Sequence, residues 1–175
     1  MNSGIEIERK FVIKMPSVAT LMQMPDYTVS EISQTYLASA GEGVTERVRR
    51  REYADGVRFY HTVKRRIDKL SCNEDEREID ESEYRSLLER RDTQGQTVEK
   101  TRHTFSFGAL TVEIDKYRGW DTVAVLEVEL PSRETSLTLP DFIEEIFEAT
   151  GKFELSNAEL YKHFPTEEEL LSYYL

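Results

Sequence analysis

Hydrophobic and polar residues alternate along most of the first 131 residues of the chain. In the segment 4–14, every second position from Ile5 is mostly apolar, and the positions between carry Glu6, Glu8 and Lys10. Successive side chains of a strand point to opposite faces, so this alternation predicts a strand with one apolar and one polar face. Strands are predicted in this way at 4–14, 28–38, 43–53, 56–66, 72–79, 96–107, 109–118 and 122–130.

Helical spacing interrupts the strands twice and replaces them after Pro131. Asp80 is a suitable N-cap for the second of these helices. The first helix after Pro131 is predicted from Pro140, which suits a first turn, and from Gly151, which suits a C-terminal end. The predicted helices cover 15–25, 80–91, 139–151, 156–164 and 166–175.

Short connections between the predicted strands favour antiparallel neighbours. The sequence "ADG" at 54–56, for example, is a hairpin turn signal between two strands. We therefore expect a mainly β (α+β) fold with a closed eight-stranded antiparallel β-barrel. No repeat or linker divides the 175 residues, so we expect a single domain. Its barrel would lie at about 4–131 and its C-terminal helices at about 139–175.

Charges on the polar faces are sorted by sign from strand to strand. A solvated face of a one-sided sheet would explain the alternation. It would not explain the sorting, because opposite charges are usually placed across from each other. The alternative is a charged face that points into the barrel and binds ions. The cations are Arg47, Arg49, Lys64, Lys100 and Arg102, and the carboxylates are Glu6, Glu8, Glu74, Glu76, Glu113, Asp115, Glu127 and Glu129.

Each sign of charge suits a different ligand. Carboxylates two residues apart offer hard oxygen ligands to Mg²⁺ or Mn²⁺. Arginine and lysine side chains at the same spacing can bind successive phosphates. A face with both sets therefore predicts a divalent cation bound together with a phosphorylated anion, and the cation would supply positive charge that the chain lacks.

Composition narrows the function classes. The formal net charge of −11 argues against non-specific nucleic-acid binding, which depends on an excess of Lys and Arg. No apolar run approaches the ~20 residues of a membrane helix, so no membrane association is expected. Cys72 is the single cysteine, and the three histidines lack metal-ligand spacing. We expect a cytoplasmic protein.

A series of short motifs resembles the CYTH family, the triphosphate tunnel metalloenzymes. The segment "EIERKF" at 6–11 is similar to the family's ExExK signature. Further elements follow in the family's order over roughly residues 5–160, namely "QTYL", "ERVRRR", "HTVK", "NEDEREI", "KTR", "VEID", "RGW", "LEVEL" and "FELSNAEL". The start "GIEIERKF" most resembles the small bacterial branch whose members often hydrolyse inorganic triphosphate.

The resemblance implies a tunnel fold, Mg²⁺ or Mn²⁺ as cofactor and a small-molecule triphosphate as substrate. It assigns the five cations named above to the phosphates and the eight carboxylates to metal binding. It places Glu6, Glu8 and Lys10 in the catalytic group, where Lys10 would either organise the carboxylates or help to activate water. Lys162 would either cap the tunnel or be a solvated helix lysine. The chain departs from the bacterial branch at Cys72, where an arginine is usual.

The predicted reaction is hydrolysis of inorganic triphosphate to pyrophosphate and phosphate. The alternatives are a class IV adenylyl cyclase that makes cyclic AMP from ATP, and a thiamine or nucleoside triphosphatase. A third alternative is a non-catalytic polyphosphate- or nucleotide-binding module, whose carboxylate set should be incomplete. The sequence leaves open whether the chain forms a homodimer.

Overall fold

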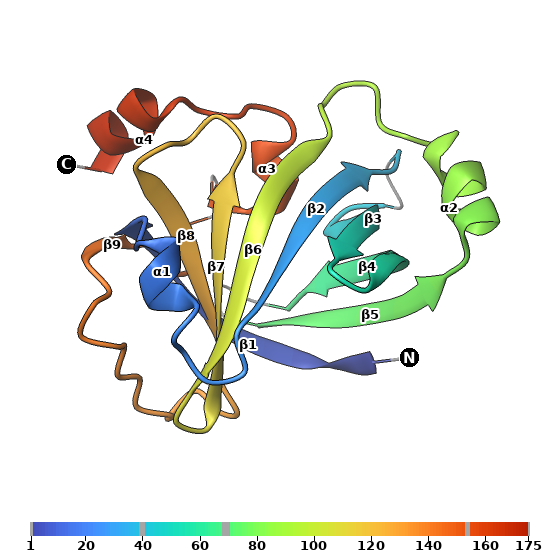
Figure 1. Ribbon diagram of the computed structural model, residues 1–175. Helices are drawn as coiled ribbons and strands as arrows, with labels where there is room; N and C mark the ends of the chain where they lie inside the picture. Colours follow the sequence, from blue (N-terminus) through green and yellow to red (C-terminus); the bar gives the residue numbers. More distant parts are fainter. Residues whose placement is uncertain (1, 39–40, 68–70, 153–154, 175) are drawn as a thin grey trace.

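The alternating segments fold into the strands of one sheet in a computed structural model (Figure 1). The structure describes residues 2–38, 41–67, 71–152 and 155–174, and it describes the side chains of these residues except 2–6, 71, 173 and 174. Within these limits the strands are β1 (Asn2–Lys14), β2 (Thr28–Tyr36), β3 (Val44–Tyr53), β4 (Gly56–Arg66), β5 (Ser71–Ile79), β6 (Val98–Phe107), β7 (Leu110–Tyr117), β8 (Val123–Glu129) and β9 (Glu145–Glu148). The helices are α1 (Val18–Leu21), α2 (Glu81–Leu88), α3 (Asn157–Leu160) and α4 (Glu167–Tyr174).

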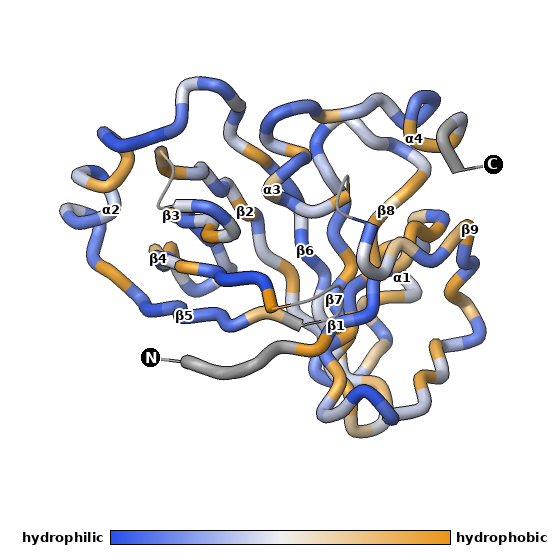
Figure 2. The backbone as a smooth tube through the Cα atoms, turned by 180° about the vertical axis from the view of Figure 1, so that it is seen from behind, coloured by the Kyte–Doolittle hydropathy of each residue, from blue (hydrophilic) through white to orange (hydrophobic). Residues whose placement is uncertain are grey.

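All paired strands are antiparallel, which confirms the predicted mainly β fold. Their order in the sheet is β5-β4-β3-β2-β6-β7-β8-β1-β9. The first eight strands are the predicted ones, with ends that differ by a few residues. Orange positions recur between blue ones along β7 and β8, whereas β5 is blue for most of its length in Figure 2.

β1 joins the two ends of this sheet. Its residues from Asn2 to Ile7 pair with β5, and its residues from Glu8 to Lys14 pair with β8. The predicted closed barrel therefore needs one correction. No described residue of β1 pairs with both β5 and β8, so a continuous hydrogen-bond ladder does not close the sheet laterally. The eight strands instead form a curved sheet whose two ends are connected along the length of β1.

The polar face of the sheet points inward, and helices and loops cover its apolar outer face. Val48, between Arg47 and Arg49, packs with Ile79 against side chains of α2. On the other side, the outer residues of β1, β6, β7 and β8 form a second cluster with Leu21 of α1 and with apolar residues of the segment 137–143. Burial of these outer clusters fixes the strand register, because a one-residue slip would exchange the two faces.

The inner face becomes apolar toward one end of the sheet. Val12, Tyr36, Val98, Tyr117 and Val125 share strand parity with the inner charged residues but belong to an apolar cluster. Residues of α3 and α4 complete this cluster, and both helices lie over that end of the sheet in Figure 1. The charged part of the interior is therefore bounded on one side by an apolar end.

The predicted helix at 139–151 is wrong. This segment contains turns followed by β9, which pairs with Phe11, Val12 and Ile13 of β1. The physical reason is tertiary: beyond Ile7, β1 has β8 on one side only, and an uncovered edge there would expose unpaired backbone groups. Ile146 and Phe147 also pack against the apolar cluster. The other helix predictions are confirmed in shorter form, and Asp80 caps α2 by accepting a hydrogen bond from the Glu83 amide.

Candidate functional site

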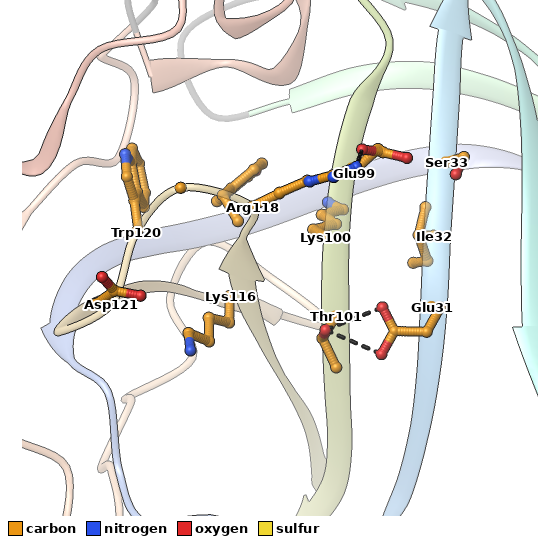
Figure 3. Close-up of a pocket in the computed structure, with 12 residues that line it drawn as sticks. Glu31, Ile32, Ser33, Glu99, Lys100, Thr101, Lys116, Arg118, Trp120 and Asp121 are labelled. Carbon is orange, nitrogen blue, oxygen red and sulfur yellow. Dashed lines mark hydrogen bonds and ion pairs between the residues drawn. The ribbon is translucent and has the colours of Figure 1, made fainter.

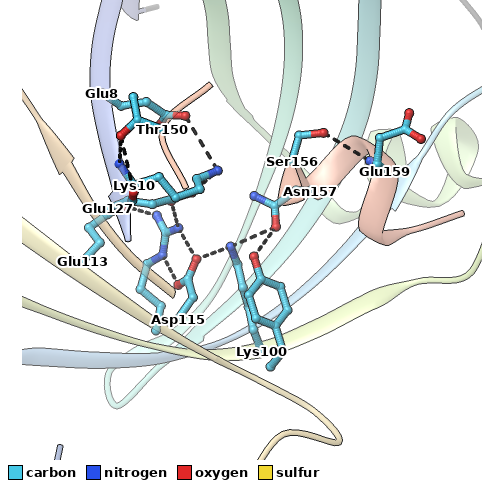
Figure 4. Close-up of polar contacts among 12 residues, drawn as sticks. Glu8, Lys10, Lys100, Glu113, Asp115, Glu127, Thr150, Ser156, Asn157 and Glu159 are labelled. Atoms are coloured by element: carbon cyan, nitrogen blue, oxygen red, sulfur yellow. Dashed lines mark hydrogen bonds and ion pairs between the residues drawn. The ribbon is translucent and has the colours of Figure 1, made fainter. Parts of the chain in front are cut away.

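Two carboxylates of β1 and β8 meet at a buried lysine. Lys10 lies opposite Glu127 in the pairing of β1 with β8, and its Nζ lies 2.8 Å from Glu127 Oε1. Glu8, two residues earlier on the same face of β1, lies 3.8 Å from the same nitrogen. Burial alone would lower the pKa of Lys10, but the charges of Glu127 and Glu8 raise it overall. Lys10 is therefore a protonated cation that holds the two carboxylates together (Figure 4).

Arg102 of β6 connects three carboxylates of β7 and β8. Its guanidinium donates two hydrogen bonds of 2.6 Å to Asp115, one of 3.0 Å to Glu127 and one to Glu113. Glu113 and Glu127 lie directly opposite each other in the sheet, a placement that destabilises it unless a cation compensates. Arg102 supplies this compensation. Lys100 donates to Asp115 from the next inward position of β6.

A second group of charges lies on β3, β4 and β5. Arg49 donates to Glu76 at 2.7 Å, and the Thr62 hydroxyl donates to the same carboxylate oxygen at 2.8 Å. Glu74 lies 3.1 Å from Lys64 Nζ and 4.0 Å from Arg47. The register places these side chains on the inner face of the sheet, as the alternation predicts. Cations and carboxylates therefore alternate around the interior as ion pairs.

The ion pairs are largely withdrawn from solvent. The side chains of Asp115 and Lys100 are 0% and 1% exposed, and that of Arg49 is 8% exposed. Burial alone would raise the pKa values of Asp115 and Glu127, but neighbouring cations lower them overall. Burial lowers the pKa of Lys100 to about 8 despite its contact with Asp115. The carboxylates are thus held in their charged form by the cations that face them.

Glu129 and Lys162 stand apart from this interior arrangement, and the side chain of Glu6 cannot be placed within it. Glu129 shares strand parity with Glu127 but is exposed. The side chain of Glu6 lies outside the described residues, although its backbone pairs with Cys72. Lys162 lies 2.9 Å from Glu159 and is 51% exposed, which matches the interpretation as a solvated lysine rather than a cap on the tunnel.

The profile of the CYTH domain family matches residues 4–164 of the chain. The chain belongs to the CYTH family. Over 161 residues this CYTH chain is 30% identical to an inorganic triphosphatase of Acetivibrio thermocellus, covering 91% of the chain and 95% of that protein. The structure of the inorganic triphosphatase NE1496 has a TM-score of 0.58 at 24% identity, covering 91% of this chain and 96% of the other. The PH1012 protein of Pyrococcus horikoshii has a TM-score of 0.55 at 22% identity, with coverage of 74% and 81%.

The two solved structures share the fold of this CYTH chain, and the family resemblance seen in the motifs is confirmed. The helices formed by the described residues lack the length and apolar character of a membrane span.

A divalent cation would find oxygen donors in this CYTH domain, but its ligands are not gathered in advance. No three acidic, histidine or cysteine side chains among the described residues form a metal-binding group. The carboxylates meet at cations instead, with Glu8 and Glu127 on Lys10 and with Glu113 and Glu127 on Arg102. Carboxylate oxygens are the hard donors that Mg²⁺ and Mn²⁺ prefer, and these carboxylates already lie around shared cations. Glu8, Glu113 and Glu127 are described residues that would hold it, and Glu74, Glu76 and Asp115 stay predicted ligands.

Sequence reasoning missed Asn157 and Tyr117, which meet at the apolar end of the CYTH interior. Asn157 begins α3 and accepts a hydrogen bond of 2.6 Å from the Tyr117 hydroxyl, and its Oδ1 lies 3.5 Å from Lys100 Nζ (Figure 4). The N-cap Ser156 fixes the start of α3. The segment "SNAEL" belongs to the family resemblance, but nothing in its spacing indicates that the asparagine reaches a strand 57 residues earlier.

A surface pocket of about 410 Å³ lies elsewhere (Figure 3). Its charged side chains come mainly from the outer face, where Thr101 donates to Glu31 and Arg118 donates to Glu99. Glu99 and Thr101 alternate with Lys100 and Arg102 along β6, so their side chains point away from the interior. Lys100 lines this pocket, but none of the other cations and carboxylates predicted for the site is among its described lining residues.

Proposed function

We propose that this CYTH chain hydrolyses inorganic triphosphate to pyrophosphate and phosphate, with a divalent cation as cofactor. The observation that carries the proposal is the matched set of buried cations and carboxylates on the inner face of one sheet. The likeness to the inorganic triphosphatase of Acetivibrio thermocellus, at 30% identity over nearly the whole chain, supports the choice of substrate.

The ion pairs explain why such an interior could bind both ligands together. A buried charge is costly when it loses its partner. A polyphosphate that takes Arg49 from Glu76 would leave that carboxylate without its cation, and a metal ion that takes Glu127 would leave Lys10 and Arg102 with one carboxylate fewer each. When both ligands bind, each cation gains a phosphate and each carboxylate gains a metal ion. We therefore expect metal and anion to strengthen each other's binding.

Each part of the interior has a distinct task in this proposal. Arg47, Arg49 and Lys64 would bind phosphates from one side, and Lys100 and Arg102 from the other. Lys10 would remain protonated and position Glu8 and Glu127, because its raised pKa makes it a poor proton acceptor. When bound, a divalent cation would polarise phosphate oxygens and neutralise developing charge. Catalysis would then depend on placement and charge stabilisation, as in other phosphoryl transfers.

The test is incubation of the purified protein with tripolyphosphate and Mg²⁺ or Mn²⁺. We expect phosphate and pyrophosphate in equal amounts, and no turnover in excess EDTA. Parallel reactions with ATP and thiamine triphosphate, in which phosphate, pyrophosphate and cyclic AMP are measured, test the other substrates. Full activity in EDTA contradicts the metal requirement. Cyclic AMP as the main product from ATP indicates a cyclase, and binding without any product indicates a binding module.

A further inference from the structure

Gln34 is a buried amide without a hydrogen-bond partner among the described residues. It is 0% exposed, and both its Nε2 and its Oε1 are buried and unpaired. An unpaired polar group in the interior costs stability, and few native proteins keep one without a reason. The roles proposed above do not use Gln34.

The position of Gln34 in the sheet relates it to the charged interior. β2 lies between β3 and β6, the two strands that carry the inner arginines. Gln34 lies directly opposite Arg49 on β3 and opposite Val98 on β6, so it shares their inner face. Strands are spaced at about 4.8 Å, which separates β3 from β6 by roughly 10 Å. An anion bound by Arg49 and Lys100 together must cross β2 near Gln34.

Two further unpaired donors lie beside this amide. The Nε atoms of Arg47 and Arg49 are buried and have no partner among the described residues, although Nη2 of Arg49 donates to Glu76. Gln34 and these two arginines occupy neighbouring strands on one face. One acceptor-rich ligand would therefore satisfy their free N–H groups together.

We propose that Gln34 is a substrate-binding residue, whose Nε2 donates a hydrogen bond to a phosphate oxygen of a polyphosphate lying across β2. The proposal rests on the proposed function for the identity of the anion. A neutral amide recognises the position of an oxygen atom without adding charge. Gln34 therefore favours a linear polyphosphate that reaches from β3 to β6 over a single small anion bound on either strand.

A purely structural role makes the opposite prediction about stability. If Gln34 Oε1 accepted a hydrogen bond from Arg49 Nε, the amide would stabilise the free protein. Its replacement by an apolar residue would then lower the melting temperature. If the amide is satisfied only by a ligand, the same replacement removes an unpaired polar group and raises the melting temperature of the free protein.

The test compares Gln34→Leu with Thr35→Val. Thr35 is the next residue, points to the other face of β2 and shares a hydrogen bond of 2.9 Å with Thr97. We expect Gln34→Leu to melt about 2–4 °C higher than the wild type without ligand. We expect it to bind tripolyphosphate about 10- to 100-fold more weakly, as calorimetry in EDTA and the KM with Mg²⁺ would show. Thr35→Val should melt lower and bind tripolyphosphate as the wild type does.

Gln34→Glu is a second variant of similar shape. Its carboxylate would pair with the nearby arginines, so it should fold and should bind tripolyphosphate even more weakly than Gln34→Leu. Wild-type affinity and KM in both variants, or a lower melting temperature in Gln34→Leu, overturn the role of Gln34 and leave the proposed function intact. A wild type that neither binds nor hydrolyses tripolyphosphate overturns both.

Discussion

Arg49 and Arg50 are adjacent in sequence but lie on opposite faces of β3. Arg49 is buried and bonded to Glu76, whereas Arg50 lies 2.8 Å from Glu52 in a partly exposed pair. We predict that Arg49→Ala lowers kcat/KM for tripolyphosphate. The expected loss of transition-state stabilisation is about 2–4 kcal/mol, as for other preorganised charge donors. Extra Mg²⁺ should not restore the rate. Arg50→Ala is the control and should retain wild-type kinetics. Equal rates for the two variants would mean that the inner face is not the site.

Replacement of Glu127 is expected to affect both stability and metal binding, because Glu127 pairs with two cations. Glu127→Gln leaves Lys10 and Arg102 without one carboxylate each, which should reduce the free energy of unfolding by about 1–3 kcal/mol. It should also weaken metal binding, so the rate should recover in part at high Mg²⁺ or Mn²⁺. Urea unfolding and metal titrations of the activity measure the two effects. A rate independent of metal concentration would exclude Glu127 as a metal ligand.

The short helix α3 brings a chain-distal residue to the end of the charged interior. Asn157→Ala removes the acceptor of the buried Tyr117 hydroxyl and a neighbour of Lys100, so we predict a lower melting temperature together with a higher KM for tripolyphosphate. Tyr161→Phe is the matched control, because the Tyr161 hydroxyl donates to Asp92 outside this group. It should lower the melting temperature without changing the KM. A KM unchanged in Asn157→Ala would limit α3 to a structural role.

Local patterns predicted most elements because each strand has one covered and one charged face. Val48 and Ile114, for example, lie between inner charges and pack outward as their parity predicts. The segment 139–151 failed because its Pro140 and Gly151 satisfy helix rules locally, while the decisive partner is β1, more than 130 residues earlier. Tertiary pairing of this kind leaves no periodic signal in the segment itself.

Acid should destabilise the whole molecule through its interior carboxylates. Burial alone would raise the pKa values of Glu74, Asp115 and Glu127, but the cations that face them lower these values overall. At acidic pH the unfolded chain therefore binds more protons than the folded one. The carboxylates contribute fully to the free energy of unfolding above their pKa values in the unfolded chain, near pH 4. This contribution is lost as pH falls through their lower pKa values in the folded protein.

Urea unfolding at pH values from 7 to 3 measures this effect. We predict a free energy of unfolding that falls steeply below about pH 4. The opposite result, a protein that gains stability on mild acidification, would show that the carboxylates repel one another more than they attract the cations.

The signs of the interior charges could be predicted from sequence, but their pairing could not. Strand parity identified Arg49, Lys100 and Asp115 as inward residues. It could not show that Arg49 already pairs with Glu76, or Arg102 with Glu127, two strands away in each case, because that depends on sheet order. The buried amide of Gln34 was visible only as part of "QTYL", since burial without a partner is a property of the fold.

The two-sided pairing of β1 has a consequence for the chain as it leaves the ribosome. β1 is synthesised first, but its partners β5, β8 and β9 follow at residues 71, 123 and 145. Contacts so distant in sequence make folding slow. A nascent chain must carry the second part of β1, from Glu8 to Lys14, unpaired until β8 has been made, exposing an edge on which other chains can aggregate. The charges at its start, Glu6, Glu8, Arg9 and Lys10, therefore also protect the waiting strand during its own synthesis.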